Sequence, residues 1–567
     1  MSLPITKTLI NLLVLDEGMP FETDVRKLLT ERLKLDEIPL EKPKPEFGDL
    51  AFPCFILAKE WKKSPVEIAR QLATELEPEG DIRRIEANGP YLNFYMEKGD
   101  YAKDVLAEIR KKGKNYGSSG EGKGRKMLIE HTSINPNASP HVGRARNAII
   151  GDCIARVMKF QGYKVKRHFY VNDVGKQIAM LVMAAKKKPS FSSLLTLYIK
   201  VNEEIKIQPE KEKEVFELLR NLEEGDVAVK KKFRQVVDIC IEGQSAILKD
   251  FGITYDFFDY ESDYLWNRQT KHVLRELEKT EKLFTDEHNR QVLDQEGFGL
   301  SMKTPVFVLT RGDGTSLYGL RDIAYNFDKM RQAKKNLVVL GEDQKLYFQQ
   351  IKAALEMLGH EAPEVIHYSF VLLAGEKMST RKGSVVLLED FMSEAKEKAA
   401  KEILERGYSK NVKKMAKVIG YGAIKYAILK VSADKNVHFD WTTALSFEGE
   451  TGPYIQYAHA RICSILRKHG KKLPDCDASV LISREETELL KRLGEFPEIV
   501  KEAERKPQVL TSYIYNVARQ FSDFYHNHPV LKAKEQKRDA RLQLCSAVKQ
   551  VLATGLDLTG IEAPERM

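Results

Sequence analysis

The sequence contains few cysteines, and they are not arranged to hold a metal. Six cysteines are spread over 567 residues, and no two of them form a C-x-x-C pair. Structural zinc sites depend on such pairs, so we expect no metal site built from cysteines, or any other metal site of the protein's own. Isolated thiols are typical of a reducing compartment, which predicts a cytoplasmic protein.

Long apolar segments are also missing. No window approaches the roughly 18 uncharged apolar residues that suggest a membrane span, so we expect no membrane partner. A short apolar stretch lies near the start of the chain, but no basic run precedes it and Asp16 and Glu17 follow it. We interpret this stretch as an amphipathic helix and not as a signal peptide. Tandem repeats and low-complexity blocks are absent too.

The composition is that of an ordinary soluble, core-forming protein. Hydrophobic residues make up 43% and charged residues 31% of the chain. At roughly 100–200 residues per domain, the length predicts about three to five domains. The net charge of +9 permits a polyanionic partner. Solvated lysines and arginines are the better explanation of that charge taken alone, so it identifies no partner.

Residues 1–115 are predicted to form an α+β domain. Helical patterns cover about 3–15, 21–34 and 50–76, and a strand pattern covers 91–96. Five glycines between positions 113 and 125 indicate a linker.

Residues 116–390 alternate between strand and helix patterns, as a parallel α/β sheet does. Strands are expected at 127–132, 165–171, 306–309, 337–340 and 365–373, and a helix at 142–160. A charged helical region, about 181–300, is predicted to be inserted into this sheet. Residues 391–440 are expected to form a helical stem and 441–567 a helical bundle.

The first motif lies where the strand at 127–132 is followed by a loop and the helix at 142–160. Free N–H groups and the positive end of the helix dipole at such a helix start favour an anion. His141, Arg144 and Arg146 could donate to phosphate oxygens, and Gly143 would let a flat base lie against the backbone. A histidine at a helix start is more often a cap or surface residue, so the motif depends on its context.

The second motif is the sequence GEKMSTRKGSVV at 375–386. It follows an apolar strand, and ligands of open α/β sheets bind at the carboxyl ends of the strands. A loop carrying Lys377, Ser379 and Lys382 could stabilise the charge that develops on a leaving pyrophosphate. Read alone, the segment is equally well explained as an exposed basic turn.

Together the two motifs resemble the HIGH and KMSKS signatures of class I aminoacyl-tRNA synthetases. His141-Val142-Gly143-Arg144 is similar to the first, and Lys377-Met378-Ser379-Thr380-Arg381 to the second. Arg144 replaces the second histidine of HIGH. Thr380 replaces the second lysine of KMSKS, for which Arg381 or Lys382 could substitute. The resemblance implies a split Rossmann-like catalytic domain that uses ATP and Mg²⁺. The implied ATP-binding residues are His141, Gly143, Arg144, Lys377, Met378 and Ser379, and the implied catalytic residues are His141, Arg144, Lys377 and Lys382.

Further segments contain acids suited to an arginine substrate, because carboxylates pair bidentately with a guanidinium. Tyr318 and Asp322 are spaced i, i+4 and can share one face of a helix. These segments closely resemble arginyl-tRNA synthetases. In that family the residues matching Glu130, Asn135 and Gln344 hold the backbone groups of the amino acid. Those matching Glu261, Tyr318 and Asp322 hold its guanidinium.

The flanking segments resemble the same family. Residues 44–51, with Phe47, are similar to an N-terminal domain implied to contact the corner of the tRNA. Residues 454–461 are similar to an anticodon-binding helix, which implies tRNA contacts for Tyr454, Tyr457 and Arg461. The implied partners are tRNA-Arg, L-arginine and ATP, with tRNA bound before arginine is activated. We expect a monomer.

Two alternatives remain. A cysteinyl-tRNA synthetase would have the same catalytic fold, but the cysteine spacing provides no zinc ligands. A non-catalytic RNA-binding paralogue would keep the fold without the chemistry. The presence of Lys377, Glu261 and Asp322 argues against a paralogue, while Arg144 argues for it.

Overall fold

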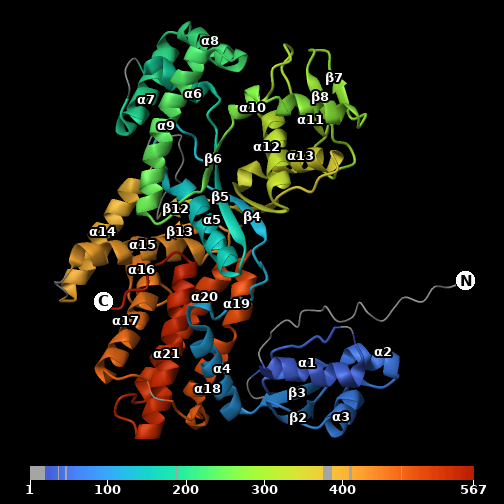
Figure 1. The fold of residues 1–567 in the computed structure, drawn as a ribbon, viewed down its shortest axis with the longest axis vertical. Helices are drawn as coiled ribbons and strands as arrows, with labels where there is room; N and C mark the ends of the chain where they lie inside the picture. Colours follow the sequence, from blue (N-terminus) through green and yellow to red (C-terminus); the bar gives the residue numbers. More distant parts are fainter. Residues whose placement is uncertain are drawn as a thin grey trace, which may run out of the picture.

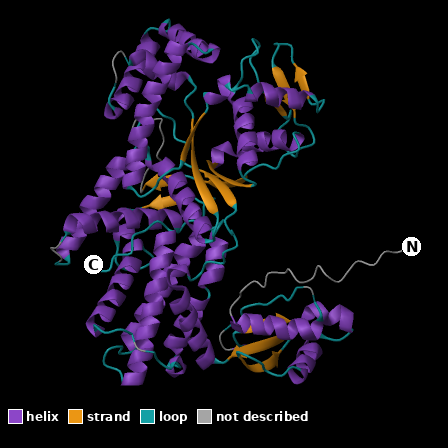
Figure 2. Ribbon diagram, in the orientation of Figure 1, coloured by secondary structure: helices purple, strands orange, loops and turns teal. Residues whose placement is uncertain are grey.

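The computed structural model describes residues 20–567 except 36, 45–46, 186–188, 374–385, 408–410 and 474. An N-terminal module, a central sheet with a helical insertion, and a C-terminal helical bundle make up an elongated molecule (Figures 1 and 2). The helix predicted over 3–15 lies outside the described residues, as do Lys377, Met378, Ser379 and Lys382.

The N-terminal module packs helices against a small antiparallel sheet whose strand order is β1-β3-β2. The helix predicted over 50–76 is wrong in its first part. Residues 50–53 form a fully buried strand that pairs with residues 91–94. Pairing with a strand distant in sequence overrides the local helical pattern. The elements are α1 (Pro20–Leu33), β1 (Leu50–Pro53), α2 (Ala58–Trp61), α3 (Pro65–Glu75), β2 (Ile82–Asn88) and β3 (Tyr91–Met96).

The glycine-rich segment 113–125 is packed against the rest of the protein. It follows α4 (Lys98–Lys112), which contacts α18 and α21 of the C-terminal bundle. The Tyr116 hydroxyl donates to the Leu493 carbonyl at 3.0 Å, and its ring stacks on Phe496. A Cβ at Gly122 would lie 2.3 Å from the backbone nitrogen of Tyr163. Because Gly122 has no side chain, the segment can pack closely against Tyr163.

A five-stranded parallel sheet forms the centre of the molecule, in the order β11-β10-β4-β5-β6. The predicted strands at 127–132, 165–171 and 337–340 and the helix at 142–160 are confirmed, apart from shifts of one or two residues at the strand ends. Helix α5 packs on β4, β5 and β10. The elements are β4 (Lys126–Glu130), α5 (Val142–Phe160), β5 (Lys164–Val171), β6 (Phe257–Tyr260), α12 (Tyr318–Gln332), β10 (Lys335–Gly341), α13 (Lys345–Met357) and β11 (Glu364–Tyr368).

Two predicted strands belong to other sheets. Residues 306–309 contribute β9 (Val306–Val308) to a small antiparallel sheet, with β7 (Leu283–Thr285) and β8 (Gln291–Asp294). The strand predicted over 365–373 divides into β11 and β12 (Val371–Leu373), and β12 pairs with β13 (Val437–Phe439). At the break, the backbone N–H of Phe370 donates to Asn436 Oδ1 at 3.1 Å. This contact directs the chain away from the central sheet.

A helical subdomain lies between β5 and β6 and projects from the sheet (Figure 1). It is shorter than the insertion predicted over about 181–300, because residues 257–260 pair with β5 in the central sheet. It consists of α6 (Lys176–Ala184), α7 (Phe191–Ile207), α8 (Lys211–Glu224) and α9 (Val227–Asp250). Helices α10 (Asp263–Trp266) and α11 (Gln269–Glu278) follow β6. The amide of Gln244 in α9 donates to the Ala138 carbonyl at 2.8 Å. The insertion therefore contacts the loop that precedes α5.

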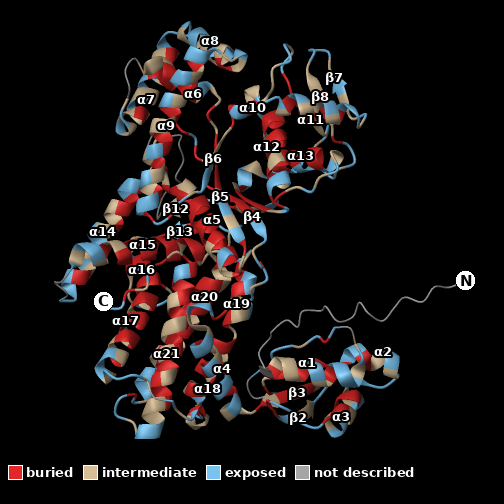
Figure 3. Ribbon diagram, viewed as in Figure 1, coloured by how far each residue is buried: buried red, intermediate tan, exposed pale blue. Residues whose placement is uncertain are grey.

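The C-terminal part is helical, as predicted, and its core is continuous with that beneath the sheet. Figure 3 shows buried residues running from α5 through α15 into α20 and α21. No described helix is both long and apolar enough to cross a bilayer. The helices are α14 (Leu388–Glu405), α15 (Val412–Leu429), α16 (Trp441–Leu445), α17 (Gly452–His469), α18 (Arg484–Gly494), α19 (Phe496–Ala503), α20 (Pro507–Asn527) and α21 (Glu535–Leu558).

Candidate active site

A cavity of about 110 Å³ lies at the carboxyl ends of β4, β5 and β10. This is where open α/β sheets bind their ligands. Arg144 reaches it from the first turn of α5. Its lining includes Glu130, Ser133, Arg144, Asn147, Tyr170, Asp322, Tyr325, Lys329, Gln344 and Tyr347. The fold thus brings together three of the six predicted amino-acid-binding residues, namely Glu130, Asp322 and Gln344.

Asp322 is held in this cavity by two phenols. Tyr170 donates to Oδ1 at 2.8 Å, and Tyr347 donates to Oδ2 at 2.5 Å. Burial raises the pKa of the Asp322 carboxyl above its ordinary value, while the two hydrogen bonds oppose that rise. Within the described part of the chain, no lysine, arginine or histidine forms an ion pair with it. A buried carboxylate of this kind favours a cationic ligand.

Glu261 has its counter-ion within the protein. Arg321 Nε donates to Glu261 Oε1 at 2.8 Å, and both side chains are buried. Burial raises the pKa of Glu261 to about 7 against the opposing effect of Arg321. Glu261 does not line the cavity. The ion pair instead holds Arg321, the chain neighbour of Asp322.

Tyr318 and Asn135 lie beside the cavity. Tyr318 begins α12 and is 56% exposed, with its ring centroid 5.2 Å from that of Tyr347. Asn135 Nδ2 donates to Gln177 Oε1 at 3.2 Å. Both could approach a ligand that fills the cavity and extends from it.

The predicted nucleotide-binding residues at the start of α5 form its first turn. His141 is the N-cap residue, and burial together with nearby Arg144 lowers its pKa to about 4, so the imidazole is neutral at pH 7. Gly143 and Arg144 follow it in the helix. The backbone N–H of Val142 donates to the Val386 carbonyl at 3.1 Å. Val386, where the described chain resumes, therefore lies directly beside the start of α5.

Arg146 connects this helix to the strand that leads into residues 374–385. Its guanidinium is fully buried and donates to the carbonyls of Ser369, Lys435 and Ser432 at 2.7, 2.7 and 2.8 Å. Burial lowers the pKa of Arg146 to about 10, and its side chain remains charged at neutral pH. The prediction that Arg146 donates to phosphate is therefore wrong, because its guanidinium is buried against carbonyls of loops that are distant in sequence.

The turn after β4 is strained. Thr132 has φ +88° and Ser133 φ +32°, a region that L-residues rarely occupy and a β-branched residue least of all. The Thr132 N–H donates to Asn147 Oδ1 at 2.6 Å, and its hydroxyl lies 2.5 Å from the Tyr255 hydroxyl. Ser133 and Asn147 line the cavity. Asn147 was missed, although a polar residue on the apolar face of the predicted helix at 142–160 was a usable signal.

A larger cavity, about 1020 Å³, lies against α17 in the C-terminal bundle and contains all three residues predicted there. The Arg461 guanidinium lies 4.6 Å from the Tyr457 ring centroid, and that of Arg406 lies 4.2 Å from the Phe447 ring. Tyr454 also lines the cavity. Partly exposed aromatic rings beside cations suit nucleic-acid bases and phosphates. Phe47, in the N-terminal module, is 40% exposed.

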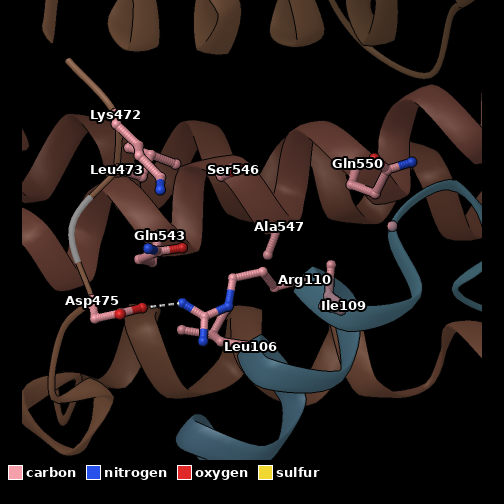
Figure 4. Close-up of a pocket in the computed structure, with 11 residues that line it drawn as sticks. Leu106, Ile109, Arg110, Lys472, Leu473, Asp475, Gln543, Ser546, Ala547 and Gln550 are labelled. Carbon is pink, nitrogen blue, oxygen red and sulfur yellow. Dashed lines mark hydrogen bonds and ion pairs between the residues drawn. The ribbon is translucent and has the colours of Figure 1, made fainter.

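Another cavity, about 710 Å³, lies between α4, α21 and the segment after α17. Arg110 and Asp475 form an ion pair of 2.5 Å at its edge (Figure 4). Its lining is a mixture of apolar, amide and charged side chains and includes none of the predicted site residues. We do not assign the active site to this cavity, because Glu130 and Asp322 line the smaller one.

Comparison with known families agrees with this arrangement over almost the whole chain. The catalytic domain of the class I tRNA synthetases (R) matches residues 105–441, the DALR anticodon binding domain matches 455–567, and the arginyl tRNA synthetase N terminal domain matches 21–96. The arginine–tRNA ligase of Methanocaldococcus jannaschii is 40% identical, covering 94% of this chain and 96% of its own length. That of Archaeoglobus fulgidus is 38% identical, covering 92% and 95%.

Among solved structures, Thermus thermophilus arginyl-tRNA synthetase superposes with a TM-score of 0.83 at 30% identity, covering 96% of this chain and 99% of its own. The Plasmodium falciparum arginyl-tRNA synthetase shares the fold, with a TM-score of 0.80 at 20% identity over 97% and 99% of the two chains. The identity and coverage extend through all three matched regions. The chain belongs to the arginyl-tRNA synthetase family of class I tRNA synthetases.

Proposed function

We propose that the protein activates L-arginine with ATP and transfers it to the 3′-terminal adenosine of tRNA-Arg. An arginine carboxylate oxygen bonds to the α-phosphorus of ATP, and pyrophosphate leaves with the electrons of the broken P–O bond. The terminal tRNA hydroxyl, the 2′ hydroxyl in class I enzymes, then attacks the arginyl carbonyl. AMP leaves and the hydroxyl proton is lost to solvent. The observation that carries the proposal is the partly buried Asp322 carboxylate in the family's catalytic domain, which belongs to no ion pair among the described residues.

In the amino-acid site, Asp322 would pair with the guanidinium, since a carboxylate accepts two parallel hydrogen bonds from it. Tyr318 would border the same end. Glu261 would act through Arg321, by holding the first turns of α12 in place. Glu130, Gln344 and Asn135 would hold the ammonium and carboxylate groups at the other end.

In the nucleotide site, Gly143 would lie under the base, while neutral His141 and cationic Arg144 would donate to phosphate oxygens. Lys377, Met378, Ser379 and Lys382 would close on the phosphates from residues 374–385. Adenylate formation depends on alignment and charge stabilisation more than on proton transfer, so fixed donors and cations suffice.

Mg²⁺ would neutralise charge on the ATP phosphates. The described residues contain no cluster of three or more His, Cys, Asp or Glu side chains that could hold a metal. An Mg²⁺ ion brought by ATP needs no such cluster, because Mg²⁺ commonly binds substrate phosphates with few protein ligands.

For tRNA, we propose that Tyr454, Tyr457 and Arg461 bind the anticodon and that Phe47 contacts the corner. Stacking on the two tyrosines and ion pairing with phosphate would provide the affinity. The proposed domains are 1–115 for the tRNA corner, 116–390 for catalysis with the insertion at about 181–300, 391–440 as a stem and 441–567 for the anticodon. We further propose that the enzyme is a cytoplasmic monomer that requires bound tRNA for activation.

Arginine-dependent exchange between ATP and labelled pyrophosphate tests this function. We expect exchange with arginine and tRNA-Arg together, little without tRNA, and none with cysteine. Charging of tRNA with labelled arginine tests the second step. A protein that binds tRNA but supports neither reaction would be a non-catalytic paralogue.

A further inference from the structure

Three buried or partly buried acids lie in or beside the small cavity, and they differ in their counter-ions. Glu261 is paired with Arg321. Glu130 is paired with Lys329 through its Oε2 atom. Asp322 accepts hydrogen bonds from two tyrosine hydroxyls and belongs to no ion pair among the described residues, although nearby Arg321 opposes the rise in its pKa. Two of the acids therefore have a cation in direct contact, and the third can take its partner from a cationic ligand.

Lys329 is an unusual residue for the inner face of a helix. It lies on α12, is 1% exposed, and lines the cavity together with Glu130. Its ammonium group lies 4.4 Å from the Tyr325 ring centroid. Burying a lysine costs desolvation and side-chain entropy, and a buried ion pair often stabilises a fold no more than apolar residues would. Its place at the cavity wall suggests a role in substrate binding.

We propose that Lys329 is a positioning residue for the amino-acid substrate, orienting the Glu130 carboxylate so that one oxygen faces the substrate ammonium. The proposal rests on the proposed function. Lys329 contacts Glu130 Oε2, and no described residue hydrogen-bonds to Oε1, which leaves that oxygen for a ligand. The ion pair also fixes the orientation of the carboxylate at the end of β4.

Lys329 also makes the two ends of the cavity different. Two unpaired carboxylates in one small site would disfavour each other's ionisation, and one would tend to protonate. Both would also be open to a guanidinium, so arginine could bind in either direction. Because Glu130 is already paired with Lys329, the guanidinium binds best at Asp322. The α-carboxylate is then directed toward the end of the cavity that contains Arg144 and the start of α5.

Several charged and titratable groups surround Glu130. Helix α12 contributes Lys329 and Asp322, and α5 contributes Arg144. Tyr170, Tyr325 and Tyr347 also line the cavity, and burial raises the pKa of each well above its ordinary value. The tyrosines therefore stay neutral across the range of an enzyme assay. Lys329 and Arg144 are the cations that face Glu130 from these elements.

Arginine-dependent pyrophosphate exchange by Lys329→Met and Lys329→Arg tests the proposal. Without its ion-pair partner the Glu130 carboxylate is no longer held in place at the end of β4, so in Lys329→Met the KM for arginine should rise on the order of 10²-fold. The KM for ATP should change little, and Lys329→Arg should restore most of the arginine affinity. Arg331 is an exposed residue of the same helix, so Arg331→Met is the matched control.

The double variant Glu130→Gln/Lys329→Met removes both charges and avoids an unpaired buried acid, so it tests the proposal even if Lys329→Met unfolds. Its KM for arginine should equal that of Glu130→Gln alone, because Lys329 acts through Glu130. Normal arginine KM in a folded Lys329→Met, a further rise in the double variant beyond that of Glu130→Gln, or equal rises for arginine and ATP would overturn the proposal. Absence of arginine-dependent exchange in the unaltered enzyme would instead refute the proposed function.

Discussion

The Tyr347 hydroxyl donates to the Asp322 carboxylate across the cavity, 2.5 Å from Oδ2. Tyr347 belongs to α13 and Asp322 to α12, so the contact joins the two helices that border the carboxyl edge of β10. With Tyr170 on the other oxygen, Asp322 is oriented before any ligand arrives. Fixed orientation reduces the entropy lost on binding and makes Asp322 the most informative residue to change first.

Asp322→Asn should raise the KM for arginine by about 10²–10³-fold, because losing one partner of a buried charge pair costs about 3–5 kcal/mol. The KM for ATP should stay within a few-fold, since the residue faces the amino acid. Steady-state pyrophosphate exchange gives both constants. Unchanged saturation by arginine would show that Asp322 does not select the guanidinium.

Lys377→Ala should lower kcat for adenylate formation by about 10²–10³-fold while weakening ATP binding far less. The expected cause is loss of charge stabilisation on the departing pyrophosphate. Transfer from preformed arginyl-adenylate to tRNA should be nearly normal, because pyrophosphate has already left. Rapid-quench measurement of each step checks this prediction. Equal impairment of both steps would indicate a structural or tRNA-binding role for residues 374–385.

Arg461→Ala should weaken tRNA binding about tenfold or more by removing a phosphate or stacking contact. The dependence of affinity on salt should become shallower. A filter-binding titration at several salt concentrations measures both effects, and Lys471→Ala, an exposed lysine just beyond α17, is the control. If Arg461→Ala binds tRNA like the unaltered protein, the cavity against α17 is not the anticodon site.

A truncation near Ser432 is a less specific test of that site than the sequence suggested. Such a truncation should abolish charging, but α21 packs on α5, and Lys425 Nζ donates to the Gly560 carbonyl at 2.6 Å. Removing the bundle would also uncover the core beneath the catalytic sheet. Loss of charging must therefore be accompanied by a measurement of folding.

Lys425 should make stability depend on pH. Burial lowers its pKa from 10.5 to about 8 in the folded protein. Between these values the unfolded chain binds more protons than the folded chain, so this residue's contribution to stability rises with pH and is lost as pH falls through about 8. Chemical denaturation of the unaltered protein and Lys425→Met over that range checks the sign. The unaltered protein should gain stability relative to the variant as pH increases, and a constant difference would contradict the assignment.

Tyr255→Phe should disturb the strained turn at Thr132. Losing the hydrogen bond from the Tyr255 hydroxyl should cost about 1 kcal/mol of unfolding free energy. Because the turn presents Ser133 to the cavity, kcat/KM for arginine should fall by more than thermal destabilisation explains. A variant that loses stability but keeps its kinetics would show that the strained turn serves only the fold.

The sequence determined the elements whose local pattern and tertiary environment agree. The helix Val142–Phe160 was predicted with its observed bounds, because its apolar face and its N-terminal turn are both encoded locally. The strand at 337–340 was predicted from a uniformly apolar run, which only a strand buried on both faces requires. The two signature motifs also predicted that the start of α5 and the segment after the last strand share one nucleotide site. Val386, which follows the second motif, lies beside Val142 at the start of α5.

The tertiary structure alone decided which distant segments pair and which charges meet. Residues 50–53 became a strand because β3 offers them backbone partners, and residues 369–370 leave the central sheet because Asn436 and its neighbours bind their backbone. The sequence predicted Glu130, Glu261 and Asp322 as arginine-binding acids, but it could not show which cations pair with them. Lys329 and Arg321 reach the first two only because the fold brings α12 beside the ends of β4 and β6. Whether an acid is free for a ligand depends on these distances, which sequence spacing does not specify.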